Sequence, residues 1–300
     1  MSLHPSRMTA NRLIRERFTR HMPTSYCAGC GHGIVLNAFT HALDYMNLRP
    51  TDVVAVSGIG CSGWVSSPHL RADTIHTTHG RAIPVAIGVK VFNPKLNVFV
   101  FTGDGDGSGI GGNHLIHAAR RNIDIMVILL NNNIYGMTGG QVSPATPQWA
   151  KTATTWENPE HPFDLAKLVE GAGATYVARW TTAHPRQLAN SIAEAYLKRG
   201  FSFIEVLSQC PTQYGRRNRP ANPFEMLQEL KTTTTRNPEK EPEKIPLGVF
   251  VRKDPKNPSF LQAMTEIKER YIQQRDEAEE PLKIKTKKSV LRRENYENRD

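Results

Sequence analysis

Oxygen-bearing side chains follow two consecutive apolar runs near the middle of this 300-residue sequence. The first run, 98–101, leads into a Gly-Asp-Gly-Asp sequence that contains Asp104. The second run, 123–130, leads into three asparagines that include Asn132. A carboxylate, an amide oxygen and a nearby main-chain carbonyl, such as that of Ile134, are hard ligands. They suit Mg²⁺, which proteins bind through a few such groups together with water and substrate phosphates.

Glycines at 107, 109, 111 and 112 follow the Gly-Asp-Gly-Asp sequence and let the backbone come close to a ligand. A helix predicted to begin near His114 would place its N-terminus between the two strand ends, where phosphate finds free N–H groups. The alternative is a glycine-rich turn beside a polar loop that binds nothing, because short motifs are weak without context. No Gly-Lys-Ser or Gly-Lys-Thr sequence follows, so this is not a nucleotide P-loop.

Four cysteines form a second set of candidate ligands. Cys27 and Cys30 make a CxxC motif between glycines at the start of a predicted helix, and Cys61 and Cys210 each follow a predicted strand. In a cytosolic chain such cysteines more often bind metal or act in catalysis than form disulfides. The spacing alone leaves open a 4Fe–4S cluster, structural zinc or a redox dithiol, since a cluster and zinc both accept four thiolates.

Taken together, the motifs resemble the β subunits of 2-oxoacid:ferredoxin oxidoreductases over roughly residues 22–225. The motifs that carry the resemblance are YCAGCGHG, SGIGCSG, THGRAIPVAIGVK, GDGDGSGIGGNHLIHAARRN, NNNIYGMTGGQ and CPT, in this order. The segment from GDG to the later asparagine resembles the thiamine diphosphate motif. The resemblance implies Mg²⁺ ligands at Asp104, Asn132 and Ile134. It also implies one 4Fe–4S cluster on Cys27, Cys30, Cys61 and Cys210.

The resemblance further implies which residues contact thiamine diphosphate. Asp106 and the loop 136–138 would lie beside the diphosphate. His79, which precedes a predicted apolar helix, could donate a hydrogen bond to phosphate, although a lone histidine is more often structural. The cofactor-binding residues predicted in this way are Ile59, Gly60, Cys61, Ser62, His79, Gly103, Gly105, Asp106, Tyr135, Gly136, Met137 and Thr138.

The activity implied by the resemblance is the oxidative decarboxylation of a 2-oxoacid, with coenzyme A as co-substrate and ferredoxin as electron acceptor. The reverse carboxylation is equally open. The segments SGIGCSGWVSSPHL and CPTQYGRRN resemble the 2-oxoglutarate enzymes most, so succinyl-coenzyme A is the expected product. Pyruvate or a broad range of 2-oxoacids is the alternative.

No residue of the sequence is a convincing general base, and no second thiamine-type domain is evident. We therefore expect an α subunit to supply the missing glutamate, in an αβ or (αβ)₂ assembly. Two other classes stay open. One is a cluster-free thiamine diphosphate decarboxylase or synthase with structural zinc at the cysteines, and the other is a non-catalytic scaffold that binds a nucleotide.

The alternation of apolar runs and helical periods predicts the elements that position these residues. We expect an α/β fold with a mostly parallel open sheet and helices on both faces, the thiamine diphosphate-binding fold, plus an irregular or helical C-terminal extension. The predicted parts are a polar, mobile arm at 1–22, the α/β domain at 23–230 and the extension at 231–300. Within the extension we expect a linker over 231–258 and a helix over 260–275.

Charge and hydropathy limit the partners. The sequence has 38 Lys and Arg against 28 Asp and Glu, a net charge of +10, with many basic residues near the C-terminus. This favours an acidic protein partner such as a small electron carrier, unless the excess is only a solvated tail. No nucleic-acid module is recognisable. No apolar run is long enough to span a membrane and the N-terminus lacks an apolar signal region, so we expect a cytoplasmic protein.

Overall fold

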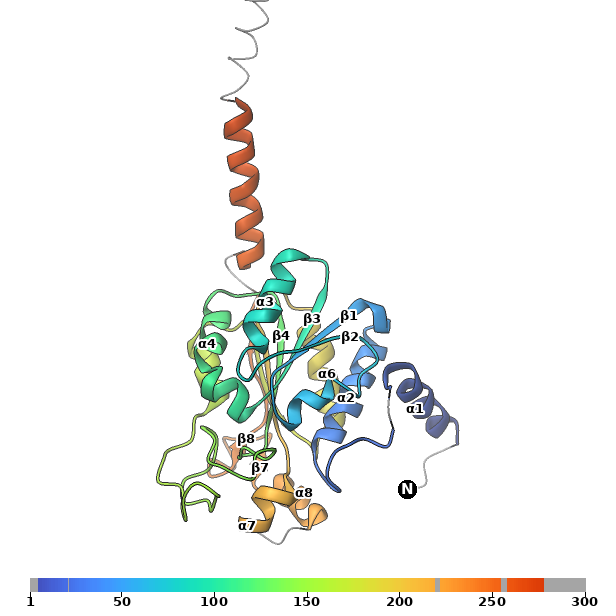
Figure 1. Ribbon diagram of the computed structural model, residues 1–300, viewed down its shortest axis with the longest axis vertical. Helices are drawn as coiled ribbons and strands as arrows, with labels where there is room; N and C mark the ends of the chain where they lie inside the picture. The colour runs from blue at the N-terminus through green and yellow to red at the C-terminus, as the bar shows by residue number, and fades with distance from the viewer. Residues whose placement is uncertain (1–4, 21, 219–221, 255–257, 278–300) are drawn as a thin grey trace, which may run out of the picture.

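A computed structural model describes residues 5–20, 22–218, 222–254 and 258–277 (Figure 1). Its centre is a seven-stranded sheet in the order β2-β1-β3-β4-β6-β5-β9. The strands of this sheet are β1 (Val53–Ser57), β2 (Asp73–His76), β3 (Asn97–Gly103), β4 (Met126–Asn131), β5 (Tyr176–Thr181), β6 (Ser202–Leu207) and β9 (Gly248–Arg252). All neighbours pair in parallel except β5 and β9, which are antiparallel. The predicted mostly parallel sheet is confirmed.

Helices cover both faces of the sheet, as predicted (Figure 1). The helices are α1 (Pro5–Phe18), α2 (His32–Tyr45), α3 (Ala82–Phe92), α4 (Gly112–Arg120), α5 (Leu165–Gly171), α6 (Pro185–Tyr196), α7 (Arg216–Asn218) and α8 (Pro223–Thr232). Short helical turns are η1 (Pro50–Asp52), η2 (Cys61–Val65), η3 (Asp106–Ile110) and η4 (Pro211–Gly215). A small two-stranded sheet pairs β7 (Thr234–Thr235) with β8 (Ile245–Pro246).

The two faces of the sheet form two separate apolar cores. Successive strand residues point to opposite faces, so Phe99 and Phe101 pack with α2 and α6 in one core, whereas Val98 and Val100 pack with α3, α4 and α5 in the other. Because both faces are covered, β4 is buried along its whole length, Met126–Asn131. This explains why its sequence is a continuous apolar run rather than an alternating one.

The predicted N-terminal arm is in part a packed helix, so the mobile arm is wrong for these residues. Phe18 at the end of α1 is fully buried, and Ile14, one helical turn earlier, packs against the same core as α2. Arg17 also forms an ion pair of 3.4 Å with Asp44 of α2. Ile14 and Phe18 are surrounded in the sequence by Arg12, Arg15 and Arg17, so the polar composition of the segment concealed this apolar pair.

The predicted linker over 231–258 is also wrong, because β9 adds the antiparallel edge strand to the main sheet. Val251 is buried in the core beside Val177 of β5. The strand is short and lies between long polar stretches, so its pattern was hard to recognise. Residues 260–277 are helical and project away from the sheet (Figure 1), in agreement with the helix predicted there.

The charged tail expected after residue 280 lies outside the described residues. The division of the chain into domains at 22 and 230 stays a prediction. Within the described part of the chain, no helix is both long and apolar enough to cross a membrane.

Candidate functional site

A cavity of about 230 Å³ lies where β1, β3 and β4 end. Open parallel sheets bind ligands at this edge, because successive loops diverge there. The residues that sequence analysis assigned to thiamine diphosphate and to Mg²⁺ all line this cavity: Ile59, Gly60, Cys61, Ser62, His79, Gly103, Asp104, Gly105, Asp106, Asn132, Ile134, Tyr135, Gly136, Met137 and Thr138. His32 and Leu130 complete the lining and were not predicted.

The three predicted Mg²⁺ ligands converge in the cavity. One atom of the Asn132 side-chain amide lies 2.7 Å from the main-chain oxygen of Ile134 and 3.2 Å from Oδ1 of Asp104. As nitrogen, this atom donates to both oxygens. With the amide in the other orientation, this atom is an oxygen, and its distances to the other two oxygens are close to the roughly 2.9 Å between neighbouring ligands of an Mg²⁺ octahedron with bonds of about 2.0–2.1 Å. The donor set therefore fits Mg²⁺.

The Asp104 carboxylate is buried, with an exposed fraction of 2%. Burial raises the pKa of Asp104 to about 6, although hydrogen bonds from the Ser143 hydroxyl and the Asn132 main-chain N–H act in the opposite direction. A raised pKa shows that no nearby positive charge compensates for the burial of this carboxylate. Perturbed pKa values of this kind are common at functional sites. A divalent cation between Asp104 and Asn132 would supply that charge.

Two residues of the loop after β4 support the Mg²⁺ ligands and were missed from sequence. Ser143 donates to Oδ2 of Asp104 at 2.5 Å. Thr146 donates to the main-chain oxygen of Asn133 at 2.7 Å and accepts from the Ser143 N–H at 2.8 Å. Asn133 has a left-handed backbone, φ 64°, so this contact holds the turn that presents the Ile134 carbonyl. Nothing in the sequence marks a serine 39 residues from Asp104 as its partner.

The second carboxylate, Asp106, ties three loops together. It accepts hydrogen bonds from the Thr102 hydroxyl at 2.6 Å, the Gly80 N–H at 2.7 Å and the Ile59 N–H at 3.2 Å. A side chain at Gly58 would meet this carboxylate at 2.0 Å, so only glycine fits there. Asp106 therefore holds together the segments that form this wall of the cavity, and its predicted place beside a diphosphate stays a prediction.

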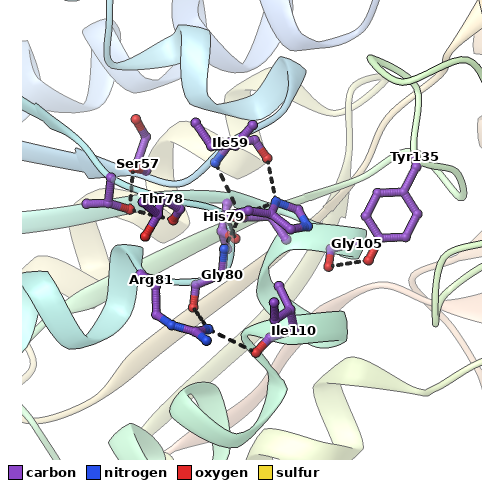
Figure 2. Close-up of polar contacts among 12 residues, drawn as sticks. Ser57, Ile59, Thr78, His79, Gly80, Arg81, Gly105, Ile110 and Tyr135 are labelled. Atoms are coloured by element: carbon purple, nitrogen blue, oxygen red, sulfur yellow. Dashed lines mark hydrogen bonds and ion pairs between the residues drawn. The ribbon is translucent and has the colours of Figure 1, made fainter.

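His79 is held on the cavity side of the same loops (Figure 2). Its Nδ1 lies 3.0 Å from Oδ1 of Asp106 and 3.2 Å from the main-chain oxygen of Ile59. The ring lies 5.8 Å from that of Tyr135, whose hydroxyl donates to the Gly105 carbonyl at 2.9 Å. Since Nδ1 faces Asp106, Nε2 is the nitrogen through which His79 could donate to a phosphate.

The four cysteines share one neighbourhood beside this cavity. Cys27 is exposed, whereas Cys30, Cys61 and Cys210 are half-buried, and none forms a disulfide. Burial, with smaller contributions from the neighbouring Cys210, Cys61 and Cys27, raises the pKa of Cys30 to about 12. Burial likewise raises the pKa of Cys61 to about 11. Across the described residues, no three His, Cys, Asp or Glu side chains are grouped closely enough to hold a single metal ion.

Comparisons with known proteins agree with this site. Residues 58–206 match the family model of the thiamine pyrophosphate enzyme C-terminal TPP-binding domain. The chain is 56% identical over 220 residues to the 2-oxoglutarate synthase subunit KorB of Methanothermobacter thermautotrophicus, covering 73% of this chain and 75% of that protein. It is 50% identical over 258 residues to the KorB subunit of Methanocaldococcus jannaschii, covering 83% and 94%. The chain belongs to the KorB family of 2-oxoacid:ferredoxin oxidoreductase β subunits.

A solved structure supports the same assignment for this family member. The 2-oxoglutarate:ferredoxin oxidoreductase from Magnetococcus marinus, with 2-oxoglutarate, coenzyme A and succinyl-CoA bound, superimposes with a TM-score of 0.78 at 32% identity. The match covers 86% of this chain and 90% of that chain. The TPP-binding model contains the cavity residues from Ile59 onward and Cys61, but ends before Cys210 and begins after the CxxC motif.

In this KorB family member, polar groups without partners gather beside the cysteines. His32 is buried, and neither of its ring nitrogens has a hydrogen-bond partner among the described residues. The same holds for the Tyr26 hydroxyl, whose ring lies 5.7 Å from His32, and for Oγ of Ser208. Burial lowers the pKa of His32 to about 4. Buried polar groups normally have partners, so these orphans and four thiols fit a region completed by a bound group.

Proposed function

We propose that the chain is the β subunit of a 2-oxoglutarate:ferredoxin oxidoreductase that binds thiamine diphosphate with Mg²⁺ and one 4Fe–4S cluster. The observation that carries the proposal is the convergence of Asp104, Asn132 and the Ile134 carbonyl in a cavity that Cys61 also lines. The named substrate comes from the KorB relatives and from the Magnetococcus marinus structure, which holds 2-oxoglutarate.

Each residue of the cavity would have a distinct task. Asp104, Asn132 and the Ile134 carbonyl would hold Mg²⁺, and His79 would orient a phosphate through Nε2. Apolar side chains such as Leu130 would keep water from the reacting centre. When bound, thiamine diphosphate supplies the carbanion and the electron sink needed to decarboxylate a 2-oxoacid.

The cysteines would hold the cluster that takes electrons one at a time. Four thiolates satisfy the ligand requirement of a 4Fe–4S cluster, and Cys27 and Cys210 lie close enough to Cys30 and Cys61 to raise the pKa of those two thiols. The side chain that a substitution would create at Gly136 lies 3.6 Å from Sγ of Cys210 and 3.7 Å from Nδ2 of Asn132. Cys210 and the proposed Mg²⁺ ligand Asn132 therefore both lie beside Gly136, so the cluster would lie close to thiamine diphosphate, which favours electron transfer from that cofactor to the cluster.

A second subunit would complete the site. Asp104 and Asp106 are the carboxylates among the described lining residues, and both already have partners, so neither is free to act as a general base. Ile59 and Met137 line the cavity with exposed fractions of 40% and 43%. An α subunit over this apolar rim would bury them and bring the missing glutamate, with coenzyme A and ferredoxin as further partners.

The proposal is tested by anaerobic purification of the chain co-expressed with its α subunit. Four irons and one thiamine diphosphate per β chain are expected, together with a reduced-cluster EPR signal after dithionite. Zinc without iron and sulfide would instead favour the cluster-free decarboxylase. Steady-state assays with coenzyme A and ferredoxin then compare 2-oxoglutarate with pyruvate, and a higher kcat/KM for pyruvate would overturn the substrate.

A further inference from the structure

Gln209 links the CxxC turn to the strand end that carries Cys210. Its side chain is buried, with an exposed fraction of 6%, and its Nε2 donates to the main-chain oxygen of Gly29 at 3.2 Å. Its main-chain oxygen accepts from the N–H of Gly31 at 3.1 Å. Both contacts lie within or directly after the turn formed by Cys27 and Cys30, although the two segments are 180 residues apart.

The orientation of the Gln209 amide is determined by a third element. Its Oε1 accepts a hydrogen bond of 2.5 Å from the hydroxyl of Thr182, which follows β5. A reversed amide would place Oε1 against the Gly29 carbonyl and Nε2 against a hydroxyl. The arrangement seen satisfies the donor and the acceptor together, and a buried amide that loses these partners pays a desolvation penalty.

The CxxC turn is also packed tightly between its neighbours. A side chain at Gly31 would meet Oγ of Ser208 at 2.3 Å and Oε1 of Gln209 at 2.6 Å. Gly29 has a φ of 76°, and a side chain there would meet Pro223 at 2.1 Å. Within the turn, the main chain contributes a bond of 3.0 Å from the Cys30 N–H to the Cys27 oxygen. The position of the turn therefore depends on surrounding elements more than on the turn itself.

We propose that Gln209 is a positioning residue that holds Cys27 and Cys30 opposite Cys210, and so determines how firmly the four cysteines retain an iron–sulfur cluster. The inference rests on the proposed function, because it requires the cluster. Gln209 acts through the main chain at Gly29 and Gly31. It belongs to none of the residues that line the thiamine diphosphate cavity.

The experiment uses Gln209→Met in the complex co-expressed with the α subunit and purified without oxygen. Methionine preserves the length of the side chain and removes the donor to Gly29 and the acceptor for Thr182. The loss of iron to a ferrous chelator is followed by absorbance, and we expect it to be about tenfold faster than in wild type or more, as for other residues that orient metal ligands. Thiamine diphosphate content stays at the wild-type value.

Gln148→Met is the matched control. The Gln148 amide also donates to a main-chain oxygen at 3.2 Å, that of Pro159, but in the loop between β4 and α5. We expect this variant to lose iron at the wild-type rate. Equal acceleration in both variants would show a general loss of stability and would overturn the positioning role.

A second pair of variants decides the matter if Gln209→Met does not assemble. Thr182→Val removes the hydroxyl that holds Oε1 of Gln209, whereas Thr182→Ser keeps it. Faster iron loss in the valine variant and wild-type behaviour in the serine variant support the inference.

Failure of this inference is distinct from failure of the proposed function. A wild-type complex that contains iron, with Gln209→Met and Thr182→Val retaining it equally well, would overturn the inference alone. A wild-type complex that contains thiamine diphosphate but no iron would overturn the cluster and the inference together. Loss of thiamine diphosphate along with iron in Gln209→Met would also overturn it, because Gln209 would then support the whole site.

Discussion

The part of the cavity around Asp104 and Asn132, here called the proposed Mg²⁺ end, differs from the cysteine end, the region of Cys27, Cys30, Cys61 and Cys210 beside it. The two differ in how far the protein alone satisfies their polar groups. At the Mg²⁺ end, Asp104 has Ser143 as a donor and Asp106 accepts from Thr102, Gly80 and Ile59. At the cysteine end, His32, Tyr26 and Ser208 carry buried polar atoms without partners among the described residues.

The difference shows that the two ends are prepared in different ways. Two carboxylates that each accept hydrogen bonds from the protein can keep their positions before a ligand binds, so this end is preorganised. Thiols whose pKa values are raised to about 12 and 11 are protonated at neutral pH, and iron must displace those protons. We therefore expect the thiamine diphosphate site to survive loss of the cluster.

The largest effect is expected for Cys30→Ala, which removes a proposed cluster ligand that does not line the cavity. The complex should contain almost no iron and should fail to reduce ferredoxin, because three cysteines rarely hold such a cluster stably. Thiamine diphosphate should stay bound, measured by its content after gel filtration. Parallel loss of thiamine diphosphate would show that the two ends are not independent.

The next largest effect is expected for Asp104→Ala. Loss of the central carboxylate should weaken thiamine diphosphate binding in the presence of Mg²⁺ by about 100-fold or more, because the cation loses its one carboxylate ligand. Iron content should stay at the wild-type value. Asp73→Ala on the edge strand β2, where the side chain is exposed, is the control and should bind normally. Unchanged affinity in Asp104→Ala would remove the Mg²⁺ assignment.

Ser143→Ala tests the proposed Mg²⁺ end by removing the hydroxyl that donates to the Asp104 carboxylate. We expect thiamine diphosphate affinity at limiting Mg²⁺ to fall about tenfold, as for other partners that orient metal ligands. Excess Mg²⁺ should restore most of the binding, which can be measured by titration of the metal-free complex. Thr152→Ala in the same loop is the control and should change nothing, because the Thr152 hydroxyl bonds within a local turn, donating to the Thr155 oxygen and accepting from the Thr154 and Thr155 N–H groups. A deficit that Mg²⁺ cannot restore would point to general loop damage.

The last effect concerns pH and is small near neutral pH. Burial raises the pKa of Asp104 from 3.8 to about 6, so protonation competes with Mg²⁺. Mg²⁺-dependent binding of thiamine diphosphate should weaken by roughly tenfold per pH unit below pH 6 and level off above it.

The sign for stability is opposite, because the raised pKa means that the folded state without cation binds the proton more tightly. Its contribution to stability is present below about pH 4 and is lost as pH rises through about 6. The metal-free complex should therefore lose stability between about pH 4 and pH 6 relative to Asp104→Asn. If Mg²⁺ binding depended on pH in the same way in the wild type and in Asp104→Asn, a group other than Asp104 would be responsible for the pH dependence of binding.

The parallel α/β fold could be predicted from the sequence alone. Strands that are buried on both faces are continuous apolar runs, and the helices between them have a clear apolar period. The same pattern placed candidate ligands at the strand ends, since Asp104, Asn132, Cys61 and Cys210 each follow such a run closely. Side chains at consecutive carboxyl ends of parallel strands meet at one edge, so a linear pattern predicts their proximity.

The contacts that hold these groups in place are visible only in the folded structure. Ser143 reaches Asp104 across 39 residues, and Gln209 reaches Gly29 across 180. Folding also buries Asp104, which raises its pKa. It likewise brings Asp106 to the Gly80 N–H, so that Asp106 joins separate segments of the cavity wall. Hydrogen bonds between distant segments produce no recurring pattern in the sequence, because the partners are close only in the folded chain. They therefore cannot be predicted from periodicity or residue spacing.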